Sequence, residues 1–170
     1  MNDSQDLTIQ EAGKIFLKHY GQHERPSWDE WGLIMAKITS TRSPDPSTKH
    51  GCVIVDKDHR IISTGYNGPA QCIDNSKVPT KRPEKYLWMI HAETNALFFA
   101  DRSVEEATVY VTGRPCSKCI SNLLQNKVSR IVYGPQGSKC VDDIDVKAGD
   151  EMIHLANVSF EYLYLSVLEE

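Results

Sequence analysis

The order of segment types along the chain predicts an α/β fold, in which helices cover a layered sheet. Strand-like segments alternate with segments of helical periodicity over the second half of the sequence, and this alternation is typical of α/β proteins. Earlier in the chain, two apolar segments flank the polar run 56–59, which predicts a β-hairpin at the start of the sheet. A chain of 170 residues can bury a substantial core, so we expect a single domain over residues 1–170.

Two helices are predicted ahead of the hairpin. Residues 8–11 form a capping box and Gly21 is a typical helix stop, which predicts a short helix within an N-terminal extension, residues 1–24. Residues 27–30 form a second capping box, and apolar residues follow it at helical spacing. This pattern predicts a core-facing helix that ends near Ser40.

The other elements follow from periodicity and from their boundary residues. They are strands at 52–55 and 60–64, a helix at 91–100, a strand at 108–112, a helix at 116–126, a strand at 129–133, a helix at 142–156 and a strand at 158–164. A long polar segment with several cations precedes the helix at 91–100. Such a segment is typical of a lid or binding loop, and equally of a surface loop with ordinary charges.

A possible metal site lies between His91 and Cys119. One imidazole and two thiolates, from His91, Cys116 and Cys119, are a suitable ligand set for a zinc ion that keeps its fourth position for water. The cysteines are three residues apart and so share one face of a helix. Pro115 suits the first turn of that helix, whose N-terminus would favour the thiolate form.

Glu93 follows His91 by two residues and is the candidate proton carrier. The pattern H-x-E followed by P-C-x-x-C is the signature of zinc-dependent nucleobase deaminases. Zinc would lower the pKa of water, and Glu93 would carry protons to the base and to the departing amine. A redox pair or a structural zinc site is the alternative for C-x-x-C alone, but a structural site would usually have a fourth protein ligand.

Composition limits the class of partner and the compartment. The formal net charge of −4 argues against tight binding to long nucleic acid. The sequence has no long apolar run and no signal peptide, so we expect a cytoplasmic protein with no membrane partner. The five cysteines are an odd count, which suits thiols in a reducing compartment.

A polar loop with two prolines, residues 41–50, separates the second predicted helix from the hairpin. Its hydroxyl groups, with Arg42 and Lys49, could hold a phosphate group. A solvated connector is the alternative. The glycines of the run 65–68 would allow a ligand to approach the backbone closely.

Together these motifs resemble the cytidine deaminase superfamily and, within it, the deoxycytidylate (dCMP) deaminases. Some relatives in this branch come from phages. The motifs that carry the resemblance are Arg42-Ser43, Asp45-Pro46-Ser47, Gly51-Cys52, Gly65-Tyr66-Asn67-Gly68, His91-Ala92-Glu93, Asn95-Ala96 and the P-C-x-x-C run. The resemblance implies a three-layer αβα fold with a five-stranded mixed sheet in the order 2-1-3-4-5. Thr112-Gly113-Arg114, before the proline, departs from the pattern of the branch.

The resemblance also implies an activity and its contacts. The activity is hydrolytic deamination of dCMP to dUMP and ammonia, in pyrimidine deoxynucleotide supply; this is a hydrolase reaction at a cyclic amidine C–N bond. Asn67 would contact the 3′-hydroxyl of the sugar, and the backbone N–H of Ala92 would meet the pyrimidine carbonyl. Tyr133 would lie against the base, and the loop with Arg42 and Ser47 would approach the phosphate.

Related enzymes are hexamers activated by dCTP and inhibited by dTTP, with Mg²⁺ on the triphosphate. The resemblance therefore implies a homo-oligomer and a second nucleotide site. Its residues would be Ser43, Asp45, Lys49, Gly65, Tyr66 and Gly68. Three alternatives stay open: a deaminase of another free cytosine compound, a deaminase of a base in RNA or DNA, and a non-enzymatic binding module stabilised by zinc.

Overall fold

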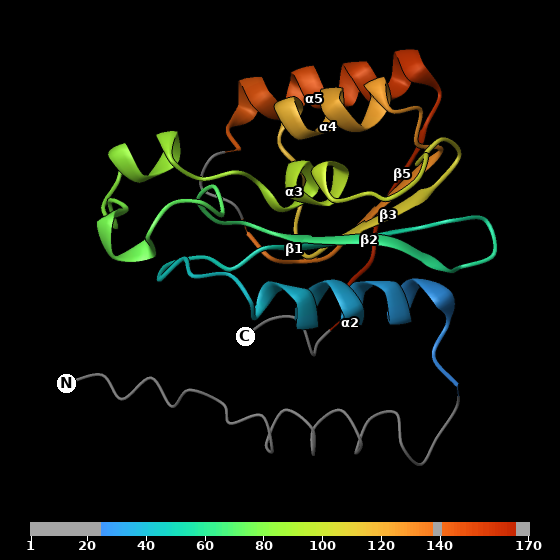
Figure 1. The fold of residues 1–170 in the computed structure, drawn as a ribbon. Coiled ribbons are helices and arrows are strands. Elements are labelled where there is room, and N and C mark those ends of the chain that lie inside the picture. Colours follow the sequence, from blue (N-terminus) through green and yellow to red (C-terminus); the bar gives the residue numbers. More distant parts are fainter. Residues whose placement is uncertain (1–24, 138–140, 166–170) are drawn as a thin grey trace.

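The computed structural model describes residues 25–137 and 141–165 (Figure 1). The helices are α2 (Trp28–Ser40), α3 (Ala92–Phe98), α4 (Ser117–Gln125) and α5 (Asp143–Ala156), with short 3₁₀ helices η1 (Asn75–Lys77) and η2 (Glu84–Leu87). The strands are β1 (Gly51–Val55), β2 (Ile61–Tyr66), β3 (Thr108–Val111), β4 (Arg130–Tyr133) and β5 (Ser159–Tyr162). The helix predicted from the capping box at 8–11, and the extension 1–24, lie outside the described residues.

The strands form one mixed sheet in the order β2-β1-β3-β4-β5, which confirms the predicted order. Strand β1 pairs antiparallel with β2 and β3, whereas β3, β4 and β5 run parallel to one another. Helix α2 covers one face of the sheet, and α3, α4 and α5 cover the other (Figure 1). The predicted three-layer αβα architecture is therefore confirmed.

The central strands are buried on both faces, because each supplies side chains to two separate cores. In β1, Cys52 and Ile54 pack with the cluster under α3, α4 and α5, whereas Val53 and Val55 pack with the cluster under α2. Successive side chains of a strand point to opposite faces, so a strand covered on both sides reads as a continuous apolar run. The sequence of β1, GCVIV, is such a run, and every one of its residues is buried.

Helix α2 begins at the predicted capping box. The Ser27 side chain accepts from the backbone N–H of Glu30, and the Glu30 carboxylate accepts from the backbone N–H of Ser27. The first turn also anchors the helix to the sheet, since Asp29 accepts from the Tyr110 hydroxyl at 3.0 Å and from Arg130 at 2.6 and 2.8 Å. Capping and anchoring together fix where α2 crosses the sheet.

The long segment between β2 and α3 folds back along the end of the sheet. It carries η1 and η2, and an isolated antiparallel bridge between Gly68 and Ile90 closes its base. Lys85, in η2, is buried, whereas a lysine in a surface loop with ordinary charges would be exposed to solvent. In residues 25–137 and 141–165, no helix combines the length and apolar character that a membrane crossing requires.

Candidate metal centre and the cavity beside it

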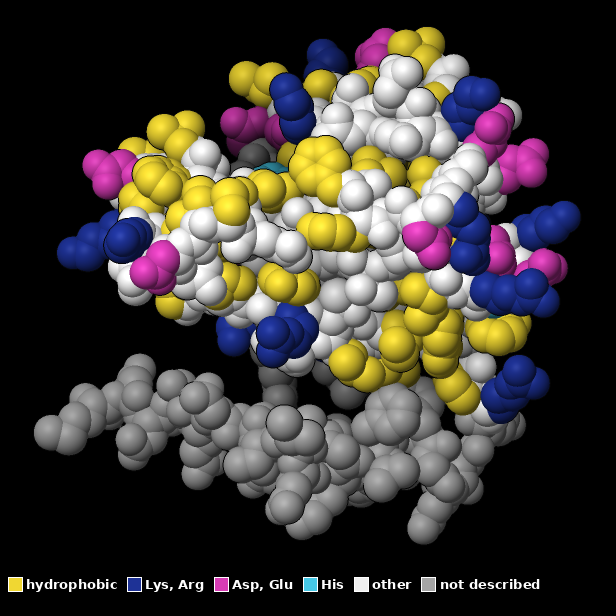
Figure 2. Space-filling view, in the orientation of Figure 1, with side chains coloured by type: hydrophobic (Ala, Val, Ile, Leu, Met, Phe, Trp, Pro, Cys, Tyr) yellow, Lys and Arg dark blue, Asp and Glu magenta, His cyan; other side chains and the backbone are white. Residues whose placement is uncertain are grey.

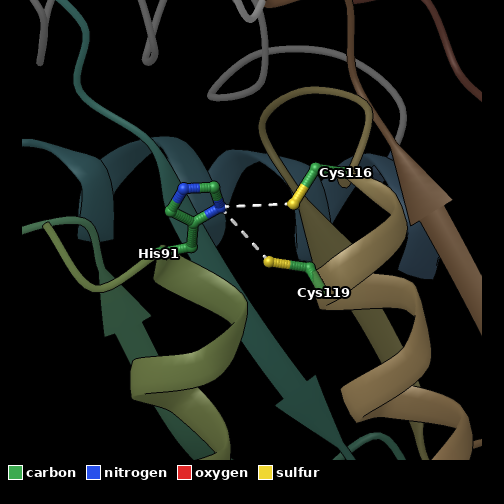
Figure 3. A group of neighbouring side chains, drawn as sticks. All are labelled: His91, Cys116 and Cys119. Atoms are coloured by element: carbon green, nitrogen blue, oxygen red, sulfur yellow. Dashed lines mark hydrogen bonds between the residues drawn. The ribbon is translucent and has the colours of Figure 1, made fainter. Parts of the chain in front are cut away.

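Two helix starts bring His91, Cys116 and Cys119 together (Figure 3). His91 is the residue that caps α3, and Cys116 is the residue that caps α4. Cys119 lies in the first turn of α4, three residues after Cys116, so both thiols share one face of that helix. Helices α3 and α4 lie on the same face of the sheet, which is why residues 25 or more positions apart meet.

The spacing of the three donor atoms fits a tetrahedral zinc ion. The His91 Nδ1 lies 3.5 Å from the Cys116 Sγ and 3.3 Å from the Cys119 Sγ, and the three donor atoms all lie within 4.8 Å of one another. Ideal Zn–N and Zn–S bonds at tetrahedral angles place nitrogen and sulfur about 3.6 Å apart. Among the described residues no other cluster of histidine, cysteine or acidic groups has this geometry.

The same contacts shift the ionisation of the ligands. A hydrogen bond with the Cys119 thiol is the main cause that lowers the pKa of Cys116 to about 4. A hydrogen bond with Cys116 in turn raises the pKa of His91 to about 8. The cluster thus already stabilises one thiolate, the protonation state in which cysteine binds zinc.

Glu93 lies in the first turn of α3 and lines a cavity next to the metal cluster. Its side chain is buried, and this burial is the main cause that raises the pKa of its carboxyl group. Glu93 is not part of the three-residue cluster. A carboxyl group that holds a proton more tightly than usual, beside but outside a metal site, can exchange protons with a bound molecule.

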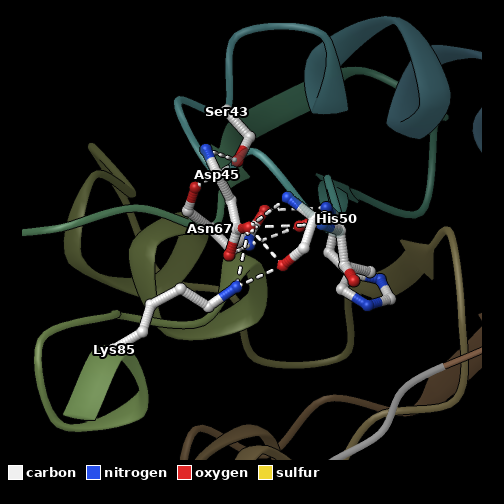
Figure 4. A network of polar contacts seen from close by, with 7 residues as sticks. Ser43, Asp45, His50, Asn67 and Lys85 are labelled. Carbon is white, nitrogen blue, oxygen red and sulfur yellow. Dashed lines mark hydrogen bonds and ion pairs between the residues drawn. The ribbon is translucent and has the colours of Figure 1, made fainter. Parts of the chain in front are cut away.

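The cavity has a polar wall that is built from the loop before β1 and from the end of β2 (Figure 4). Asp45 Oδ1 accepts from the backbone N–H groups of Ser47 and Thr48, at 2.8 and 3.2 Å. Asn67 holds this loop to the end of β2: its Oδ1 accepts from the His50 N–H at 2.7 Å, and its Nδ2 donates to the Thr48 carbonyl at 2.9 Å. The polar wall is therefore a fixed structure.

Lys85 completes the polar wall from the other side. Its Nζ donates to Asp45 Oδ1 at 2.8 Å, and the side chains of the pair are only 2% and 4% exposed. Lys85 Nζ also donates to the Ser47 hydroxyl. Two opposite charges removed from water need such close pairing, so Lys85 ties η2 to the loop before β1.

Arg114 forms another part of the cavity wall, two residues before the metal ligand Cys116. Its guanidinium carbon lies 5.7 Å from the ring centre of Tyr133 and 4.9 Å from that of Phe160. Arg114 lines the cavity and Tyr133 does not. The Tyr133 ring packs against Phe160 and Tyr162, and Arg114 lies over it, so a contact between Tyr133 and a base stays a prediction.

The other residues that the sequence predicts as substrate contacts fall into two groups, those that line the cavity and those that do not. Asn67 and Ala92 line the cavity, as does Glu93. Arg42 and Ser47 are exposed and do not line it. The phosphate contacts expected from the loop 41–50 are thus not brought to the cavity, because Arg42 lies next to the end of α2 and the Ser47 hydroxyl is used within the polar wall.

The residues expected at a second nucleotide site lie where the loop before β1 meets the end of β2, since the Ser43 hydroxyl donates to the Asn67 carbonyl at 2.7 Å. Ser43 and Asp45 are buried and bonded inward, and Lys49 is exposed. Gly65 and Tyr66 are the last residues of β2, and Gly68 follows the strand and pairs with Ile90. A Cβ at Gly65 would lie 2.2 Å from the Ala92 carbonyl oxygen and 2.3 Å from the Ala96 nitrogen. At Gly65 the missing Cβ therefore lets α3 pack closely, and a role of Gly65 in nucleotide binding stays a prediction.

Lys85 and His50 line the cavity, although the sequence placed them only within a basic loop and a polar loop and gave neither a role of its own. Lys85 resembles its exposed neighbours in a basic loop, and nothing local predicts its burial. His50 packs its Nδ1 3.2 Å from the Thr112 hydroxyl, and burial is the main cause that lowers its pKa to about 4. The unusual Thr112-Gly113-Arg114 run was a signal, since Gly113 and Arg114 line the cavity and the Thr112 hydroxyl contacts His50.

Comparison with known proteins identifies a matching family model. Residues 26–135 match the model of the cytidine and deoxycytidylate deaminase zinc-binding region. A probable deoxycytidylate deaminase of Caenorhabditis elegans is 37% identical over 138 residues, which cover 78% of this chain and 68% of that protein. The deoxycytidylate deaminase of Mycobacterium phage D29 is 36% identical over 123 residues, covering 64% and 95% respectively.

A solved structure shows the same fold. The chain is similar to the crystal structure of dCMP deaminase from the cyanophage S-TIM5 in apo form, with a TM-score of 0.63 and 24% sequence identity. The match covers 82% of this chain and all (100%) of that one.

Proposed function

The chain belongs to the cytidine and deoxycytidylate deaminase family, and on this premise we propose that it is a zinc-dependent enzyme that converts dCMP and water to dUMP and ammonia. The observation that carries the proposal is the metal cluster with the buried Glu93 beside it, in one cavity. Relatives whose names specify deoxycytidylate, such as those of Caenorhabditis elegans and phage D29, support dCMP as the substrate.

His91, Cys116 and Cys119 would hold the zinc ion. Bound there, zinc supplies a Lewis acid that lowers the pKa of water. The donor spacing and the available thiolate fit this ion, as described above.

Glu93 would move the protons of the reaction. Its carboxylate would accept a proton from the attacking water and deliver it to N3 of the cytosine, which makes C4 electrophilic. After oxygen bonds to C4, Glu93 would take the remaining proton from the new C4 hydroxyl and pass it to the amino group. The C4–N bond then breaks, which leaves a carbonyl at C4 and releases ammonia. The high pKa that burial gives this carboxyl group suits a residue that both accepts and donates.

Asn67 and Ala92 would orient the substrate. The Ala92 N–H, at the first position of α3, would donate to the pyrimidine carbonyl. The Asn67 side chain is held by three contacts of the polar wall, so a sugar hydroxyl would meet an amide of fixed orientation.

Regulation and assembly are the finer part of the proposal. We expect a homo-oligomer, with a hexamer as the candidate, in which dCTP activates and dTTP with Mg²⁺ inhibits. Apolar side chains exposed outside the cavity support self-association: Leu87 is 89% exposed, Ile144 81% and Leu155 75%. Figure 2 shows hydrophobic side chains over the segment that carries η1 and η2. Tyr66 and Lys49 remain candidate effector contacts.

A substrate panel tests the activity. Purified protein is incubated with cytosine, deoxycytidine, dCMP, dCTP, CMP and a short oligonucleotide, and products are followed by mass spectrometry for replacement of the amine by a carbonyl. We expect dCMP to be converted with the highest kcat/KM. Faster conversion of the oligonucleotide or of a nucleoside would refute dCMP as the substrate, and conversion of none would favour a binding module.

A further inference from the structure

The run Thr112-Gly113-Arg114 is the part of the site that the proposed reaction leaves unexplained. It departs from the dCMP branch pattern, and Gly113 and Arg114 both line the cavity. Arg114 stands two residues before the metal ligand Cys116, so its backbone is fixed relative to the reacting end of the cavity. Its side chain brings a positive charge to a wall where an aromatic residue was expected.

The guanidinium group of Arg114 is held in place from two sides. Tyr133 and Phe160, from neighbouring parallel strands, form an aromatic surface beneath it. From α5, Asp150 Oδ1 accepts from Nη2 at 2.7 Å. A guanidinium group stacked on aromatic rings and fixed by a carboxylate loses little freedom when it binds a further anion.

Arg114 also has donors to spare. A guanidinium group carries five N–H donors. The Nη1 contact with the Tyr133 hydroxyl is long, at 3.4 Å, and each Nη nitrogen carries two N–H groups, so donors remain for a ligand. Asp150 is 57% exposed, so solvent screens the charge that would oppose a second anion. Unused donors on a fixed cation suit an anion with several acceptor oxygens.

The other cations that line the cavity are less suited to this task. Lys85 is buried against Asp45, which balances its charge and occupies its donors together with Ser47. Arg82 is exposed, and its guanidinium carbon lies 5.4 Å from the ring centre of the partly exposed Tyr86. Among the described cations that line the cavity, Arg114 is the one that combines a fixed position with spare donors.

We propose that Arg114 binds the 5′-phosphate of the substrate and makes this site select a nucleotide over a nucleoside. The proposal rests on the proposed function, because it assumes a cytosine nucleotide in this cavity. It replaces the phosphate contact that the sequence placed at Arg42. Recognition would use charge-assisted hydrogen bonds, which a nucleoside with a free 5′-hydroxyl cannot match.

Binding of the product and of its nucleoside tests this directly. Titration calorimetry with dUMP and with deoxyuridine is performed on the wild type, on Arg114→Gln and on Arg60→Gln, a matched loss of charge in the exposed hairpin turn. We expect Arg114→Gln to weaken dUMP binding about 10- to 100-fold and to change deoxyuridine binding less than about twofold. Arg60→Gln should change neither. KM for dCMP should rise with kcat largely retained.

A purely structural role predicts a different outcome. If Arg114 only ties α5 to the sheet, Asp150→Asn, which breaks the same ion pair and keeps the guanidinium group, would weaken dUMP binding as much as Arg114→Gln. That result would overturn the proposal, as would an equal loss of dUMP and deoxyuridine binding. If Arg114→Gln does not fold, Arg114→Met is used instead, because its side chain can still pack against both aromatic rings. The test is again whether dUMP binding is weakened more than deoxyuridine binding.

The ratio of the affinities for dUMP and deoxyuridine is measured without any turnover of substrate. A wild-type protein that deaminates nothing in the substrate panel would refute the proposed function, whereas an unchanged dUMP-to-deoxyuridine ratio in the Arg114 variants would refute only the phosphate contact.

Discussion

Two groups of ion pairs differ in how far they are removed from water. Beside the cavity, the side chains of Lys85 and Asp45 are only 2% and 4% exposed. On the α2 side of the sheet, the Arg130 side chain is 26% exposed, and its partners Asp29 and Glu161 are 32% and 49% exposed. We call the first the cavity pair and the second the α2 anchor.

This difference in solvent exposure indicates that the two groups of ion pairs have different roles. A buried ion pair gains little net stability over an apolar pair of the same shape, because both ions lose their hydration. The cavity pair is therefore better explained by the cavity whose wall it shapes than by stability. The α2 anchor joins three elements through a partly exposed arginine, and its role is to hold α2 and β5 to β4.

The largest expected effect is on kcat, and it comes from Glu93, which belongs neither to the cavity pair nor to the α2 anchor. Glu93→Gln removes the proposed proton carrier and should lower kcat by about 10²- to 10⁴-fold. Zinc content by elemental analysis and the melting temperature should stay at wild-type values. The matched change in the α2 anchor, Glu161→Gln, should leave kcat unchanged. A wild-type kcat in Glu93→Gln would exclude it as the proton carrier.

Breaking the cavity pair should give the largest loss of stability. Lys85→Met leaves the Asp45 carboxylate buried without its cation, and we expect the free energy of unfolding to fall by about 3–5 kcal/mol in urea titrations. The double variant Asp45→Asn/Lys85→Met removes both charges and should recover part of this loss of stability. If the double variant were as unstable as the sum of the single ones, the two charges would not be coupled.

Breaking the α2 anchor should reduce the free energy of unfolding by less than breaking the cavity pair. Arg130→Met removes charge-assisted bonds to Asp29 and Glu161, but solvent screens these partly exposed groups, so we expect a loss of about 1–2 kcal/mol. Added salt should reduce this loss and leave that of Lys85→Met nearly unchanged. Because Arg130 lies outside the cavity lining, kcat/KM should be unaffected. A larger loss of stability than in Lys85→Met would reverse the comparison.

Mild acid should give the smallest effect. Burial raises the pKa of Asp45, but the bond from Lys85 and the donors of Ser47 and Thr48 lower it further, so the net shift is downward. A bond from Arg130 is the main cause that lowers the pKa of Asp29. A lowered folded-state pKa contributes stability above the unfolded value near 4, and this contribution is lost as pH falls through the folded pKa.

We therefore expect roughly 0.3 kcal/mol of lost stability per carboxylate between pH 6 and 4, and more below pH 4. Urea titrations across this range should show a shallower decline in Asp45→Asn and in Asp29→Asn than in the wild type. A wild-type slope in either variant would show that the carboxylate does not contribute to the acid sensitivity.

The metal cluster could be predicted from the sequence because its geometry is local. Cys116 and Cys119 share a helix face by their spacing alone, and His91 and Glu93 begin a helix in the same way. The apolar runs of the strands and the capping box of α2 likewise depend on near neighbours in the chain. These patterns, with the family resemblance, were sufficient for the sheet order and for the candidate zinc ligands.

The rest of the cavity was decided by tertiary structure. Lys85 and Asp45 are 40 residues apart, and only the path of the chain between β2 and α3 makes their charges meet in a buried place. Arg114 lies over Tyr133 because parallel strands carry Tyr133 and Phe160 beneath it. The residue type of a lysine or arginine does not reveal which neighbours will remove it from water, because the same side chain occurs both buried and exposed. The local motif therefore determines the metal ligands, whereas the packing of distant segments determines which charged groups surround the cavity.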